Sequence, residues 1–182
     1  MRHILQPHPD FPCAAVSGIE VYVSRGKTGS LLVHYYLAGG VDDVTPSLRS
    51  ASTFRRADEL WQHTCFEAFV KPAGSETYWE FNAAPTWDWQ AYGLSGYRTG
   101  RHPVEGISKP SIEGRYGHDG WELRVHWPLA SMVPNDVDWQ VGLSAVIEDK
   151  DGTISYWALA HAPGKPDFHH ADAFVLQLPG IP

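Results

Sequence analysis

Apolar and polar residues alternate along most segments of this chain, and this period of two restricts the fold more than any other feature. In residues 121–127 the odd-numbered positions are apolar, whereas Glu122, Arg124 and His126 occupy the even-numbered positions. Successive side chains of a β-strand point to opposite faces, so this segment would bury one face and expose the other. The polar positions of residues 111–115 would then pair beside it on a solvated outer face.

Turn signals separate these segments at short intervals, as in antiparallel hairpins. Asp-Gly stands at the tips of two of them, where it supplies the positive φ that tight turns need. The predicted hairpins join residues 19–23 to 31–37, 64–70 to 77–83, 110–116 to 121–127, and 139–148 to 153–159, and a last strand covers 173–178. Residues 128–132 begin with proline and would form one short helical turn. We therefore predict one domain over residues 1–182, an all-β antiparallel β-sandwich of two sheets, immunoglobulin-like or jelly-roll-like.

Composition and charge exclude several other classes of protein. The chain has 17 glycines and 14 prolines, which is too many for a helical bundle, and its 43% hydrophobic content is too high for disorder. A net charge of −7 argues against nucleic acid or an anionic membrane as the partner. No apolar run approaches the ~18 residues of a spanning helix. The first residues lack a signal-peptide pattern, and Cys13 and Cys65 form no disulfide framework, so we expect a cytoplasmic location.

The hairpin of residues 64–70 and 77–83 carries polar residues on the face that alternation turns away from the core. Glu67, Glu80 and Asn82 share that face. Aligning Phe66 with Phe81 would place Glu67 directly opposite Glu80, and two like charges in that position destabilise a sheet. A cation, a shared proton or solvent must then compensate.

Arg98 is the nearest candidate cation for this polar face. Carboxylates and an amide satisfy sugar hydroxyls, arginine donates hydrogen bonds in a fixed fork, and aromatic rings stack on the apolar faces of a sugar. The eight tryptophans fit this chemistry, because alternation assigns only Trp79, Trp121 and Trp127 to the core. Trp61, Trp87 and Trp89 fall in irregular or strand-entry segments beside the polar face.

Two other kinds of chemistry stay open at this level. A cross-strand pair of Glu67 and Glu80 also fits a glycoside-active enzyme, since such enzymes hold two carboxyl groups about 5 Å or roughly 6.5–9.5 Å apart. The second kind is a transition-metal site near the C-terminus, from His161, His169, His170 and Asp172. Those residues match no fixed ligand spacing, so we predict no metal.

Several segments together resemble the bacterial DOMON-like domains, which are related to family 9 carbohydrate-binding modules. They are residues 60–69, 78–82, 89–92, 96–98, 154–160 and 168–174, within a resemblance that spans about residues 15–178. The resemblance implies a β-sandwich that binds a sugar or, in other branches, haem. Its motif positions that would contact a sugar are Trp61, Glu67, Glu80, Asn82 and Arg98. Haem-binding relatives use a methionine and a histidine, but Met132 stands in the predicted helical turn, so no cofactor is expected.

The prediction is therefore a non-catalytic domain that binds a small saccharide or sugar derivative on a concave sheet face or an edge of the sandwich. The alternatives are the glycoside-active enzyme and a haem or metal protein. The predicted ligand-binding residues are Trp61, Glu67, Glu80, Asn82, Trp87, Trp89, Arg98 and His170.

Overall fold

The computed structural model describes residues 1–46, 48 and 53–181, and its regular structure is almost entirely β-strand. The strands are β1 (Arg2–Pro7), β2 (Val16–Gly26), β3 (Ser30–Gly39), β4 (Val44–Thr45), β5 (Cys65–Pro72), β6 (Tyr78–Ala83), β7 (Trp89–Leu94), β8 (His102–Pro103), β9 (Ser111–Tyr116), β10 (Gly120–Pro128), β11 (Trp139–Asp149), β12 (Ile154–Ala158) and β13 (Leu176–Leu178). The helical elements are short 3-10 turns, η1 (Val41–Asp43), η2 (Leu60–Gln62) and η3 (Ala171–Ala173). Within the described residues, none is a helix that could cross a membrane.

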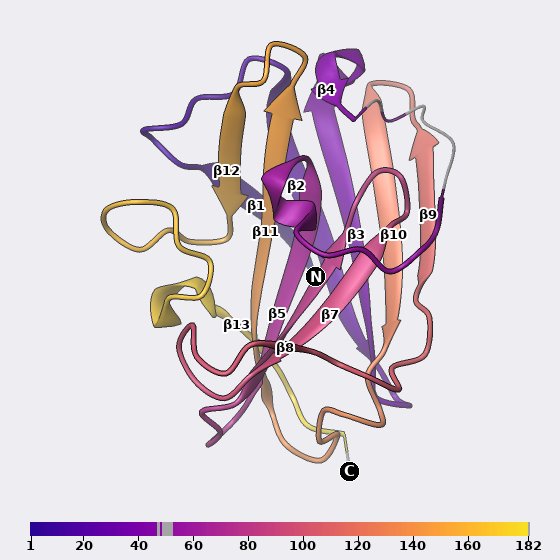
Figure 1. The fold of residues 1–182 in the computed structure, drawn as a ribbon, viewed down its shortest axis with the longest axis vertical. Helices are drawn as coiled ribbons and strands as arrows, with labels where there is room; N and C mark the ends of the chain where they lie inside the picture. Colours follow the sequence, from indigo (N-terminus) through magenta and orange to yellow (C-terminus); the bar gives the residue numbers. More distant parts are fainter. Residues whose placement is uncertain (47, 49–52, 182) are drawn as a thin grey trace.

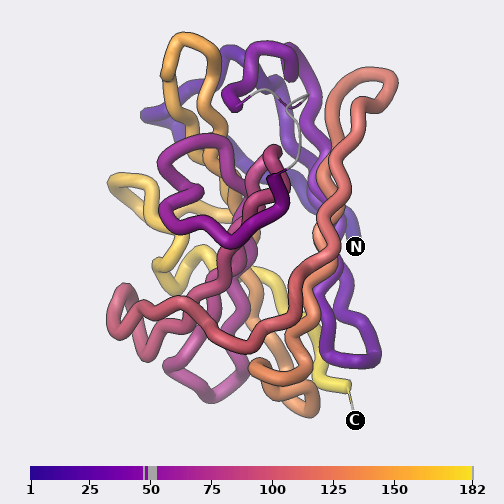
Figure 2. Tube along the Cα trace, turned by 45° about the vertical axis from the view of Figure 1, so that its right-hand side comes forward, coloured from indigo at the N-terminus to yellow at the C-terminus, as the bar shows by residue number. Residues whose placement is uncertain are grey.

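The named strands pair antiparallel along one continuous path, in the order β8-β7-β6-β5-β11-β12-β1-β2-β3-β10-β9, with β4 and β13 added beside β11. Strand β1 connects the two halves of the path, because it pairs with β12 at one end and with β2 along the rest. The path curls, so that β9 and β10 lie across from β5, β6 and β7 (Figures 1 and 2). The all-β antiparallel prediction is confirmed, but hydrogen bonding joins the strands in one curled sheet where two sheets were expected.

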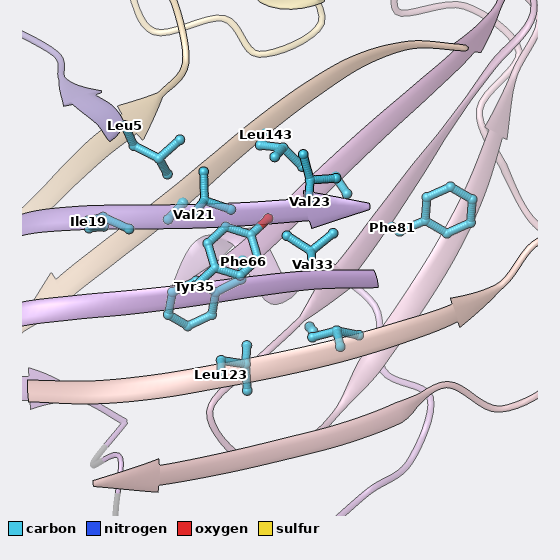
Figure 3. Packing of buried hydrophobic residues seen from close by; sticks show 14 of the residues in the cluster. Leu5, Ile19, Val21, Val23, Val33, Tyr35, Phe66, Phe81, Leu123 and Leu143 are labelled. Atoms are coloured by element: carbon cyan, nitrogen blue, oxygen red, sulfur yellow. The ribbon is translucent and has the colours of Figure 1, made fainter. Parts of the chain in front are cut away.

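The main hydrophobic core fills the space between the two halves of the curled sheet. The ring of Tyr35 on β3 lies 5.0 Å from that of Phe66 on β5, and Phe66 lies 5.8 Å from Trp121 on β10. Figure 3 shows Tyr35 and Phe66 among aliphatic side chains from neighbouring strands. The Tyr35 hydroxyl also donates a 2.8 Å hydrogen bond to the carbonyl of Glu67. Polar and apolar contacts therefore both join β3 to β5 across the core.

The four predicted hairpins are confirmed as β2–β3, β5–β6, β9–β10 and β11–β12. The predicted outer face of β10 is also present, with Glu122 opposite Arg115 and bonded to it at 3.1 Å. The last strand, β13, is shorter than the predicted range of 173–178, because the turn η3 extends to Ala173. At the predicted helical turn the N–H groups of Met132 and Val133 bond to the carbonyl of Leu129, which forms a single turn.

Strands β1 and β7 were not predicted from the sequence. Every residue of β7 is buried, so no polar and apolar alternation marks it as a strand. Strand β1 lies mostly exposed, with Leu5 as its buried residue. Alternation with a period of two identifies strands that expose one face to solvent, whereas β7 is buried on both faces.

A second apolar layer covers the outer face of β5, β6, β7, β11 and β12. Its buried members are Phe69, Tyr78, Tyr92, Leu94, Val146, Ala158 and Phe168. Phe168 belongs to the connection between β12 and η3, which packs over the strands. In Figure 2 this connection (yellow) and the turn after β7 (rose) lie at the left, away from the β9–β10 hairpin. This half of the sheet is thus buried on both faces.

We expect Trp127→Ala to lower the free energy of unfolding by about 3–5 kcal/mol, because it leaves a large cavity in the main core. Trp127 is 2% exposed and its ring lies 5.3 Å from Phe81 and 6.2 Å from Trp89. Urea unfolding followed by circular dichroism measures the change. Leu32→Ala, at a position that is 42% exposed, is the control and should stay within about 0.5 kcal/mol of the parent. An equal loss in both variants would contradict this account of the core.

Candidate functional site

The outer face of β5 and β6 carries three polar side chains, which the sequence alternation predicts to lie on one face. Glu67 stands at the middle of β5, and Glu80 and Asn82 stand on β6. The predicted register is wrong by two residues, since Glu67 lies opposite Asn82 and Glu80 lies opposite Phe69. Alternation determines the face of each side chain, but the turn between the strands sets the register. A shift of two keeps every side chain on its face, so the three still share one surface.

These three side chains are buried, and two of their oxygen atoms have no hydrogen-bond partner in the part of the chain that the structure describes. Glu67 and Glu80 are each 3% exposed and Asn82 is 0% exposed. The Asn82 amide donates a 2.7 Å hydrogen bond to Glu80 Oε1, and the Ser144 hydroxyl donates one of 3.4 Å to Glu67 Oε2. Glu80 Oε2 and Asn82 Oδ1 have no partner among the described residues. A buried acceptor without a donor is costly, so each such atom calls for an explanation.

Burial also changes the protonation of the two carboxyl groups. It raises the pKa of Glu67 well above its usual value, and the charge of Glu80 raises it further. Burial likewise raises the pKa of Glu80, against the opposing effects of the Asn82 hydrogen bond and the charges of Arg101 and Arg98. The close pair of acids therefore favours retaining a proton, which is one of the compensations expected from the sequence.

A cavity of about 180 Å³ opens above this polar group. Its lining residues are Trp61, Glu67, Glu80, Arg98, Arg101, Val146, Tyr156, Pro166, Phe168 and His169. The guanidinium of Arg101 lies over the ring of Trp61, 4.6 Å from its centroid, and over that of Tyr92, 4.8 Å from its centroid. The cavity thus has acceptors at its base, aromatic walls and cationic donors on its lining.

Arg98 is held at the cavity by Asp167, not by either glutamate. Its Nη2 donates a 2.8 Å hydrogen bond to Asp167 Oδ1, and the Tyr97 hydroxyl donates one of 2.5 Å to Oδ2 of the same carboxylate. Asp167 therefore ties the turn after β7 to the connection after β12. The expectation that Arg98 compensates the carboxylates holds only as a long-range charge effect.

Trp61 is positioned by the short turn η2 and by its contact with β7. Its ring packs edge-on against Tyr92 at 5.8 Å. The Tyr92 hydroxyl donates a 2.9 Å hydrogen bond to Asp58, which also accepts one from the amide of Gln90. Asp58 thereby ties the segment before η2 to β7 at two points.

His169 is a cavity residue that sequence reasoning did not include among the binding residues. Its Nδ1 lies 2.9 Å from the Tyr78 hydroxyl, and its Nε2 lies 3.8 Å from Glu80 Oε2. Burial, aided by the nearby charge of Arg98, lowers the pKa of His169 to about 4, so the ring is neutral near pH 7. The sequence signal was the Phe-His-His run, in which His170 and not His169 was predicted as the binding residue.

His169 also lines a second cavity of about 350 Å³ beside the first. The second cavity is where the predicted residue His170 lies, together with Lys71, Glu76, Tyr78, Tyr97, Gln140, Ala171 and Phe174. The ring of His169 is therefore shared by two adjoining hollows on this surface.

The remaining predicted residues lie elsewhere. Trp89 is 4% exposed and belongs to the main core, and Trp87 packs against that core from the side, 6.2 Å from Phe54. Met132 also packs against the main core, on the opposite side of the sheet from Glu67. Among the residues that the structure describes, no three His, Cys, Asp or Glu side chains gather as a metal site requires.

Comparison with known proteins gives a likeness of fold. No family model matches the sequence, and no curated protein matches it. A crystal structure from Bacteroides uniformis, described as a "putative carbohydrate-binding protein", superposes with a TM-score of 0.65 at 16% identity, over 99% of this chain and 86% of that one.

Two structures of a family 9 carbohydrate-binding module from Caldicellulosiruptor kristjanssonii show the same fold at 11% identity. The complex with glucose has a TM-score of 0.52 and covers 96% of this chain and 83% of that one. The complex with cellotriose has a TM-score of 0.50 and covers 90% of this chain and 74% of that one. The curled antiparallel sheet is thus an architecture that sugar-binding modules share.

We expect Glu67→Gln to stabilise the protein more at pH 7 than at pH 4. The folded state holds the Glu67 proton more tightly than the unfolded chain does, so the parent loses stability as the pH rises above the ordinary glutamate pKa. Each unit of raised pKa corresponds to about 1.4 kcal/mol. We expect the gap between variant and parent, measured by urea unfolding, to widen by at least about 1 kcal/mol.

Glu113→Gln, an exposed position on β9, is the matched control for the loss of one carboxyl group. A Glu67→Gln gap of the same size at both pH values would contradict the assignment of a retained proton to this pair.

Proposed function

We propose that this protein is a non-catalytic carbohydrate-binding domain and that the cavity above Glu67 and Glu80 is its sugar site. The observation that carries the proposal is a buried acceptor on the cavity lining, Glu80 Oε2, which has no donor among the described residues. A sugar presents several hydroxyl groups at fixed spacing, and each donates one hydrogen bond. Such a ligand would supply the missing donor for Glu80 Oε2.

The walls of the cavity suit the rest of a pyranose ring. Trp61 is half-buried and leaves part of its indole at the cavity, where it would stack against the apolar C–H face of a sugar. Arg98 and Arg101 would donate to hydroxyl or ring oxygens at the lining. The fold neighbours described above include modules bound to glucose and cellotriose, which supports a neutral sugar as the class of ligand.

The resemblance to DOMON-like domains supports the same proposal, because several of its motif positions fall at this cavity. Trp61, Glu67, Glu80 and Arg98 line it, and Asn82 lies behind Glu80 with its amide bonded to that carboxylate. His170 would contact only a ligand large enough to reach the second cavity. Trp87 and Trp89 are no longer proposed as ligand contacts.

The raised pKa values of Glu67 and Glu80 favour sugar binding over glycoside hydrolysis at this site. A glycosidase needs one carboxyl group protonated and the other ionised, as the nucleophile or base. Here burial raises the pKa of both groups, and each contacts a hydrogen-bond donor that is buried with it. Two acids with raised pKa values serve better as fixed hydrogen-bonding groups than as an acid and a nucleophile.

Isothermal titration calorimetry with glucose, cellotriose and a panel of neutral mono- and oligosaccharides tests the proposal. We expect binding by the parent, and a loss of at least about tenfold in affinity for both Glu80→Gln and Trp61→Ala. Tyr36→Ala, on the opposite outer face of the sheet, is the control and should bind as the parent does.

Two results would overturn the proposal. The first is the absence of binding across the whole panel, or binding that the Glu80 and Trp61 substitutions leave unchanged. The second is release of nitrophenol from nitrophenyl glycosides that Glu67→Gln and Glu80→Gln each abolish, which would establish the alternative of a glycoside-active enzyme.

A further inference from the structure

The atoms Glu80 Oε2 and His169 Nε2 face each other across a short gap at the cavity. They lie 3.8 Å apart, which is too far for a direct hydrogen bond. Glu80 Oε2 has no other partner among the described residues. A ligand atom that bonds to both must therefore lie beside the line that joins them, in the cavity that both residues line.

The neighbours of His169 determine which ring nitrogen carries the proton. The Tyr78 hydroxyl accepts a hydrogen bond from the backbone N–H of Arg98 at 3.3 Å, so its own hydrogen is free to go to His169 Nδ1 at 2.9 Å. Nδ1 is then an acceptor, and the proton of the neutral ring sits on Nε2. This tautomer places an N–H donor beside the carboxylate oxygen of Glu80, whereas the other would place a lone pair there.

The position of the ring is fixed from several directions. The backbone N–H of His169 donates a 3.0 Å hydrogen bond to Asp167, the same carboxylate that holds Arg98. The ring packs edge-on against Phe69 at 5.1 Å. The donor at Nε2 is thus preorganised before any ligand enters.

One donor and one acceptor at this separation match a single hydroxyl group. An oxygen atom about 2.8–3.0 Å from each would donate its hydrogen to Glu80 Oε2 and accept the hydrogen of His169 Nε2. An ammonium group has no lone pair for the imidazole N–H, and an ether oxygen has no hydrogen for the carboxylate. A carbon that lacks the hydroxyl leaves both protein groups unpaired.

We propose that His169 and Glu80 together recognise one hydroxyl of the ligand and select against sugars in which that hydroxyl is deleted or replaced by an amine. This inference rests on the proposed sugar-binding function. It names the class of ligand, which is a neutral polyol with a free hydroxyl at the position that contacts both residues. His169 is thereby a specificity-determining residue of the site.

Calorimetry with glucose and its monodeoxy and monoamino derivatives tests the inference. The parent should discriminate against the deoxy and amino derivatives at one position by roughly 10- to 100-fold, because the deoxy derivative leaves both partners unpaired and the ammonium leaves the imidazole N–H unpaired. His169→Phe keeps a ring but removes the donor, so it should bind glucose more weakly and discriminate less than the parent against the deoxy derivative at that position, where Glu80 alone still contacts the hydroxyl. His169→Gln, whose amide N–H replaces Nε2–H, should retain part of the discrimination.

A second measurement addresses the tautomer without any sugar. The nitrogen chemical shifts of the His169 ring should report a proton on Nε2 in the parent, and Tyr78→Phe should alter that preference by removing the donor to Nδ1. A proton on Nδ1 in the parent would overturn the inference.

The failures of the two proposals are distinguishable. A parent that binds no sugar of the panel overturns the proposed function and this inference with it. The inference alone is overturned if the parent and His169→Phe bind glucose with the same affinity. It is also overturned if the parent binds the amino derivatives at every position better than glucose.

Discussion

The burial of β5, β6 and β7 on both faces is the constraint on which the rest of this molecule depends. One face packs into the main core, where Phe66 and Phe81 contact residues of the opposite half of the sheet. The other face lies under the turn after β7 and the connection after β12. A carboxylate on a single-layer sheet would point into water, but Glu67 and Glu80 instead lie under a second apolar layer. Their chemistry follows from this covering, because a buried acceptor without a hydrogen-bond partner is costly.

Alternation along the sequence predicts the faces of these strands but not what covers them. The placement of Glu67, Glu80 and Asn82 on one surface follows from the period of two, since it requires only that each strand be extended. Their register was predicted two residues away from the observed one, because the strands were aligned by matching aromatic residues when the turn between them decides the pairing. The face on which a side chain lies depends on its own strand alone, whereas the register depends on how two strands pair.

The covering layer itself had no periodic signal to reveal it. Asp167 and His169 lie in a connection whose composition predicts a loop, and their importance comes from contacts with Tyr97, Arg98 and Tyr78, about 70 to 90 residues away in sequence. The tryptophans show the same limit. Trp89 is the first residue of β7, a strand that is buried on both faces, so its neighbours did not indicate on which side the indole would pack. Long-range contacts of this kind follow from tertiary packing and not from any local pattern.

Asp167 connects the covering layer to the residues that line the cavity. Its carboxylate accepts from Tyr97 and Arg98 on one side and from the backbone of His169 on the other. The charged Arg98 and the neutral His169 ring are thereby held at fixed places around the same cavity before a ligand arrives. Because the donors and acceptors are already fixed in place, a ligand that supplies the matching hydroxyls loses little of its binding free energy to ordering the protein. A ligand with a misplaced or missing hydroxyl leaves a dehydrated group unpaired, so the same rigidity that favours the matching sugar disfavours its near relatives.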